Sequence, residues 1–106
     1  RQFGSDDYDD GLAVSANASG VFVAGFTYAS LPGLVSAGDS DVFVRKYDTD
    51  GTELWSRQFG SSSRDEGYAI SVDASGSVLV GGVVRGALPG QVDLGQQDAF
   101  VLKLVE

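Results

Sequence analysis

The sequence predicts an all-β fold built from two tandem copies of one structural unit, and three observations predict it. Fifteen glycines against two prolines are typical of many short strands joined by tight turns. Short runs rich in valine and aromatic residues alternate with segments rich in Gly, Ser and Asp. One pattern of residues also occurs twice in the 106-residue chain. We therefore expect antiparallel strands throughout.

The repeat is clearest where each copy begins. The segment Arg1 to Ser5 (RQFGS) returns 56 residues later as Arg57 to Ser61. Repeat two then gains one residue, Ser77, after which segments 41–44 and 98–101 align at an offset of 57. A period of this size with β character predicts β-propeller blades, each of four antiparallel strands. Repeat one covers residues 1–56 and repeat two covers residues 57–106.

The strands are expected in the same order in both repeats. The first strand is predicted at 12–16 and 68–72, the second at 21–27 and 78–84, the third at 42–47 and 99–104, and the fourth at 53–59. Tight turns at 17–20, 73–76 and 48–51 place Gly where a positive φ is expected. The longer segments 28–40 and 85–97 then lie on the opposite rim, where ligands are expected to bind.

Charge and composition exclude several classes of partner and site. The formal net charge is −8, which repels nucleic acid and anionic lipid headgroups. The sequence has no Cys and no His, so thiolate and imidazole chemistry is absent. No apolar run approaches the ~20 residues that a membrane-spanning helix needs. We expect no nucleic-acid partner, no membrane insertion and no catalytic activity.

Three segments carry a resemblance to a known repeat family. They are WSRQFG at 55–60, VDASGSVLVGG at 72–82 and DVFVRKYDTDG at 41–51. Together they resemble the SBBP or β-propeller repeat of bacterial surface and secreted proteins, over the whole chain. The resemblance implies a propeller fold and an extracellular or cell-surface location, and it brings no catalytic residues and no cofactor.

An acidic loop is the candidate metal site. Asp6, Asp7, Asp9 and Asp10 offer hard oxygen ligands that could hold Ca²⁺. Repeat two keeps only two acidic residues at the corresponding positions, which favours a solvated loop instead. The segment 48–51 (DTDG) resembles the opening of a calcium loop, but it lacks the later ligands and is better explained as a hairpin turn.

Other recurring residues are expected to be structural. Trp55 could stack on a sugar, but its position in a strand near Phe59 favours packing between blades. Asp41 and Lys46 recur as Asp98 and Lys103, and a recurring pair at one blade position favours structural hydrogen bonds or ion pairs over a unique site.

These features favour a non-catalytic β-propeller module that self-assembles and binds a protein or glycan through its rim loops. Two alternatives remain open. The chain could be an engineered or excised fragment without a ligand, or a glycoside-cleaving enzyme with carboxylates drawn from Asp6, Asp7, Asp39 and Asp41.

Assembly follows from counting strands. Repeat two stops after its third strand, whereas segment 1–4 repeats the end of a fourth strand. Two blades cannot close a ring, because rings take roughly four to eight blades. We expect a closed trimer or tetramer of the chain, with segment 1–4 of each chain added to the open edge of its neighbour. In a longer polypeptide the same surfaces would meet within one molecule.

Overall fold

The chain folds into two antiparallel sheets. A computed structural model describes residues 1–105, and these contain strands but no helix. The first sheet has the order β1-β2-β3-β4, and the second has the order β5-β6-β7. The strands are β1 (Asp9–Asn17), β2 (Gly20–Thr27), β3 (Asp41–Tyr47), β4 (Glu53–Phe59), β5 (Asp65–Val72), β6 (Ser77–Val84) and β7 (Asp98–Val105). The prediction of an all-β, antiparallel fold is confirmed. No helix able to cross a membrane is present in the described part of the chain.

The tight turns lie where the sequence predicts them. Gly51 and Gly76 have φ angles of 85° and 88°, which side chains other than glycine rarely adopt. Asp48 caps its turn, because its Oδ1 accepts hydrogen bonds of 2.9 Å from the backbone of Asp50 and Thr52. The segment 48–51 is therefore a hairpin turn between β3 and β4, as expected.

The first strand of each repeat is longer than predicted, and it contains a bulge. The register of β1 against β2 shifts between Gly11 and Ala13, and that of β5 against β6 shifts between Gly67 and Ala69. Strand pairing continues past the bulge to Asp9 and to Asp65. Acidic residues are uncommon in strands, so the pattern of apolar residues did not reveal this extension.

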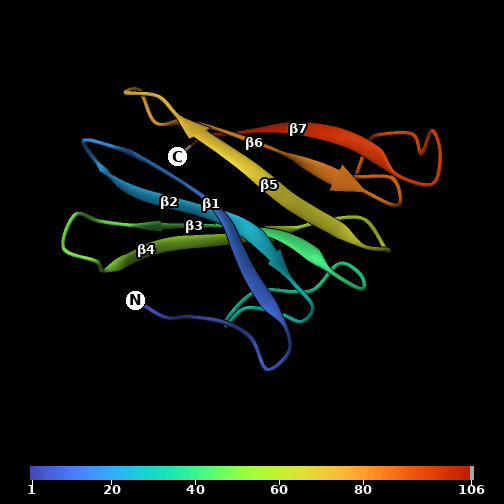
Figure 1. Ribbon diagram of the computed structural model, residues 1–106, viewed down its shortest axis with the longest axis horizontal. Helices are drawn as coiled ribbons and strands as arrows, with labels where there is room; N and C mark the ends of the chain where they lie inside the picture. Colours follow the sequence, from blue (N-terminus) through green and yellow to red (C-terminus); the bar gives the residue numbers. More distant parts are fainter. Residues whose placement is uncertain (106) are drawn as a thin grey trace.

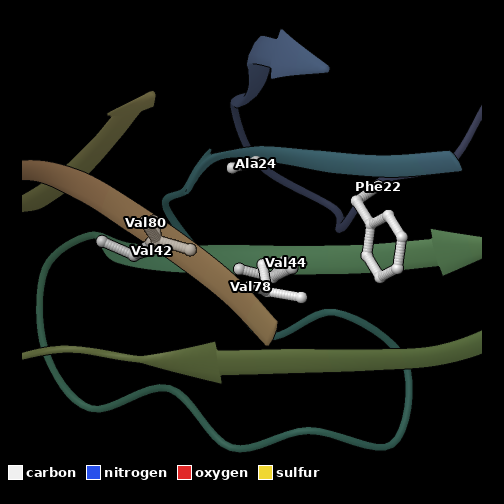
Figure 2. Packing of buried hydrophobic residues seen from close by; sticks show 6 residues of the cluster. All are labelled: Phe22, Ala24, Val42, Val44, Val78 and Val80. Carbon is white, nitrogen blue, oxygen red and sulfur yellow. The ribbon is translucent and has the colours of Figure 1, made fainter. Parts of the chain in front are cut away.

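The two sheets pack face to face (Figure 1). β5 lies against β1, β2 and β3 of the first sheet. The core between the layers has Phe22 and Ala24 from β2, Val42 and Val44 from β3, and Val78 and Val80 from β6. Figure 2 shows the valines of β6 lying over those of β3. The buried run in β2 agrees with the prediction of a strand inside the stack.

The outer face of the second sheet is open. In the alignment of the two repeats, the residues on this face are the counterparts of residues on the inner face of the first sheet. Val44 is 0% exposed, whereas its counterpart Val101 is 78% exposed. Phe22 is likewise 0% exposed, and its counterpart Leu79 is 47% exposed. One apolar surface thus occurs twice in the molecule, covered once and uncovered once.

Candidate functional site

A glutamine joins the edge strand of the first sheet to the long loop at residues 28–40. Gln58 on β4 donates from Nε2 to the Ala29 carbonyl at 2.8 Å and to Asp41 Oδ2 at 3.0 Å. Its Oε1 accepts a 3.0 Å hydrogen bond from the backbone N–H of Leu31. Asp41 Oδ2 also accepts from the Ala37 N–H at 2.6 Å. We call this arrangement the amide junction. It uses both the donor and the acceptor of the glutamine side chain.

A second carboxylate follows the junction along the chain. Asp65, fully buried at the start of β5, accepts two hydrogen bonds of 2.7 Å, from the backbone N–H and the hydroxyl of Ser61. Asp9 binds Ser5 in the same way, at 2.8 Å and 2.9 Å. Asp65 therefore fixes the bend between β4 and β5, and Asp9 fixes the bend between the N-terminal segment and β1.

Gly60 lies between the two buried carboxylates. A side chain at this position would collide with Asp65 Oδ2 and would approach Asp41 Oδ1 to 2.8 Å. Asp41 Oδ1 is itself buried without a hydrogen-bond partner among the described residues. The close approach of these groups explains why the recurring segment RQFGS has glycine before serine.

Burial dominates the electrostatics of Asp65. Loss of hydration raises the pKa of this carboxyl above its ordinary value of 3.8, and the nearby Asp41 charge raises it further. The two hydrogen bonds from Ser61 act in the opposite direction, because they stabilise the ionised form. Since the pKa of Asp65 is raised on balance, ionising this group in the folded protein costs stability.

Beside β7 the second sheet has an open cavity of about 630 Å³. Among residues 1–105 no strand pairs with the free edge of β7. The cavity is lined by apolar side chains of β7, such as Phe100, Leu102 and Leu104, and by the loop at 85–97. It is bounded on the other side by Phe59 of β4. The edge and the apolar lining together can accept an extended polypeptide segment.

Asp98 lies at the end of this edge in the position of Asp41. Its Oδ2 accepts a 2.8 Å hydrogen bond from the Leu94 N–H, which matches the bond between Asp41 and Ala37. No side-chain amide within residues 1–105 donates to Asp98 as Gln58 donates to Asp41. Half of an amide junction is therefore present at the edge of the second sheet.

The N-terminal segment is held against the outer face of the first sheet. The ring of Phe3 packs edge-on against Phe43, with 5.4 Å between centroids. The guanidinium of Arg45 lies 4.1 Å from the centroid of Phe3. This cation–π contact and the aromatic pair fix Phe3 next to β3.

The four aspartates of the predicted metal site lie near one another in sequence but serve different contacts. Asp9 is bound to Ser5, whereas Asp7 Oδ1 accepts a 2.7 Å hydrogen bond from the Tyr8 N–H. Asp6, Asp7 and Asp10 are exposed. No group of three or more acidic residues in the described chain is arranged to hold a metal ion. Calcium binding here stays a prediction.

Trp55 and Lys46 lie on the inner face of the first sheet. The ring of Trp55 is 6.1 Å from that of Phe22 and packs against the core between the sheets, as the packing interpretation predicts. Lys46 is buried and donates to the hydroxyl of Ser19 at 3.0 Å. Asp41 has the structural hydrogen bonds expected of a recurring residue.

Sequence reasoning missed Gln58 and Asp65. Both were visible as recurring residues, since Gln58 repeats Gln2 and Asp65 repeats Asp9. The available signal was the recurrence of a polar amide between an arginine and a half-buried phenylalanine. An amide at a strand edge gains most when it meets both a donor and an acceptor.

Comparison with known proteins gives a partial match. No family model matches the chain. The chain is 34% identical to a protein of Caulobacter vibrioides named "Regulatory protein FlaEY", in an alignment 101 residues long that covers 87% of the chain. It spans 11% of the length of that relative. The match therefore concerns one short part of a much longer protein.

Proposed function

We propose that the chain is a two-blade β-propeller module of the SBBP type, without catalytic activity, whose role is to associate through its sheet faces and edge. In this proposal each sheet is a blade, and an extracellular or cell-surface setting follows from the resemblance. The rim loops 28–40 and 85–97 remain available to a protein or glycan ligand.

One observation carries the proposal: the open face of the second sheet repeats the covered face of the first. Val101 and Leu79 occupy the positions of the fully buried Val44 and Phe22. The outer face of the first sheet of another copy would cover Val101 and Leu79. Apolar surface that is contiguous and uncovered favours association. The occupant we assign to this face is a second copy of the chain.

The contact is head to tail. The second sheet of one chain meets the first sheet of the next, so the two surfaces involved are different. A heterologous contact of this kind closes into a ring when the rotation between units allows it. Three or four chains would give six or eight blades, within the range of roughly four to eight that propellers use.

The first test places a charge on the open face. Val101→Asp puts a carboxylate where the contact is proposed, and burying it without a partner is costly. We expect this variant to be folded, with an unchanged circular dichroism spectrum, and to sediment as a monomer where the wild-type chain is associated.

Val35→Asp is the matched control. Val35 is 84% exposed and does not line the cavity beside β7, and its counterpart Val92 is 77% exposed even though another sheet precedes it. Position 35 should therefore stay outside the contact and leave association unchanged. Equal association of wild type, Val101→Asp and Val35→Asp would contradict the proposed surface.

A further inference from the structure

The groups that hold Gln58 in the first sheet have counterparts beside β7. At the offset of 57, Asp41 corresponds to Asp98, and the loop residues that meet the amide, Ala29 and Leu31, correspond to Gly86 and Leu88. All three counterparts line the open cavity. The hydrogen bond from Leu94 already orients the carboxylate of Asp98. The second sheet thus offers a carboxylate, a carbonyl and an N–H in the arrangement that binds an amide.

We propose that Asp98, the Gly86 carbonyl and the Leu88 N–H form a binding site for the side chain of one glutamine, and that its ligand is Gln2 of a second copy of the chain. The segment Arg1 to Ser5 is identical to the segment that supplies Gln58. This inference rests on the proposed function, because it identifies the residue that sets how two copies dock.

The aromatic contacts of Phe3 hold segment 1–4 where it can pair with the edge of β7 from a second copy. Phe3 meets Phe43 as Phe59 meets Phe100, since both pairs are edge-on, with centroids 5.4 Å and 6.2 Å apart. Phe59 is the last residue of a strand that belongs to one sheet and touches the next sheet. Segment 1–4 therefore already lies against the first sheet as the end of a preceding strand would. The edge of β7 from a second copy can pair with it there.

The pairing of β3 with β4 predicts the register in which segment 1–4 would pair with β7 of a second copy. Gln58 is opposite Phe43, and Phe59 is opposite Val42. In the same register, Gln2 of the second copy lies opposite Phe100 and Phe3 lies opposite Ala99. A shift by one residue would turn Gln2 to the other face and leave Asp98 without the amide. The glutamine thus selects one register of strand addition.

Only an amide of this length satisfies the site. A glutamate at position 2 cannot donate to Asp98, and it would bring a second negative charge beside it. A lysine or arginine could donate to Asp98 but could not accept from the Leu88 N–H. The site is therefore specific for a side chain that both donates and accepts.

The experiment measures the association constant of full-length variants by sedimentation equilibrium. Gln2 is exposed, so Gln2→Glu should leave the folded chain intact. We expect Gln2→Glu to weaken association by roughly tenfold or more, because it removes a hydrogen bond to a charged group and adds repulsion. Adding Asp98→Asn should restore association, since the new amide can donate to Glu at position 2 while its oxygen accepts from Leu94. Gln96→Glu, which adds the same charge at an exposed position of the nearby loop that does not line the cavity, is the matched control and should change association little.

The outcomes separate the two proposals. If the wild-type chain associates and Gln2→Glu associates equally well, the glutamine site is wrong while face-to-face association stands. If Gln2→Glu weakens association but Asp98→Asn does not restore it, Asp98 is not the partner of Gln2 and the site is again overturned. If the wild-type chain is monomeric throughout, both proposals fail.

Discussion

Phe3 packs edge-on against Phe43 in the same way that Phe59 packs against Phe100 further along the chain. The second contact joins β4 of the first sheet to β7 of the second sheet. The contact of Phe3 with Phe43 therefore places the N-terminal segment against the first sheet as the end of β4 lies against the second sheet. The molecule therefore repeats the junctions between its units as well as its strands.

Equivalent valines should respond differently to truncation. Val44→Ala removes two methyl groups from the core and should lower the free energy of unfolding by about 2 kcal/mol. Val101→Ala makes the same change on the open face and should alter the stability of the monomer by less than about 0.5 kcal/mol. Urea unfolding of dilute protein measures both values. Equal losses in the two variants would contradict the assigned faces.

Gln58→Glu should destabilise the chain through the amide junction. The variant loses the donor to the fully buried Asp41 and places a second carboxylate beside it. We expect the free energy of unfolding to fall by about 2 to 3 kcal/mol. Gln91→Glu, on an exposed loop, should change it by less than about 0.5 kcal/mol. If both variants unfold at the wild-type urea midpoint, the junction does not contribute to stability.

Asp65 should make part of the stability depend on pH. Because its pKa is raised in the folded state, its contribution is fully present below the ordinary value of 3.8 and is lost as the pH rises through the raised pKa. Asp65→Asn removes this titration. The free energy of unfolding of Asp65→Asn, taken relative to wild type, should therefore increase as the pH rises above 3.8 and through the raised pKa.

Asp73 provides a control of opposite sign. The hydroxyl of Ser75, followed by the backbone of Ser77, lowers its pKa below 3.8. Its contribution is present above that value and is lost as the pH falls through the lowered pKa. Asp73→Asn should therefore differ from wild type mainly above pH 3.8 and lose that difference in acid. Parallel pH profiles for Asp65→Asn and Asp73→Asn would show that burial does not control Asp65.

The acidic loop should bind Ca²⁺ weakly at most. Asp9 is occupied by Ser5, and the exposed Asp6, Asp7 and Asp10 have no common centre with it. Calcium stabilises a folded protein only when its concentration exceeds the dissociation constant. We expect the same unfolding temperature in millimolar Ca²⁺ and in chelator. A clear increase with Ca²⁺ that is lost in Asp7→Ala would reveal a tight site.

The sequence predicted the strands well because the repeat supplied each signal twice. Trp55 was assigned to packing from its position in a strand, and the turn glycines Gly51 and Gly76 were assigned from their neighbours. Strand 53–59 was predicted with the bounds that the structure has. The starts of β1 and β5 were missed, because a bulge breaks the alternation of apolar and polar residues.

The candidate site was much harder to predict. Gln58, Asp41 and Asp65 come from different strands, and only the fold brings them to one end of the sheets. The burial of Asp65 depends on packing that local sequence does not reveal. The acidic loop attracted attention because its charges are adjacent in sequence, whereas the buried Asp41 and Asp65 are far apart in sequence and close in space.

The native mass of the wild-type chain tests the central claim most directly. Light scattering at rising protein concentration compares it with the chain mass of 11.0 kDa. Association through the open face and the β7 edge predicts a discrete species of three or four chains. A folded monomer that persists at every concentration, with Val101 and the edge of β7 open to water, would contradict it.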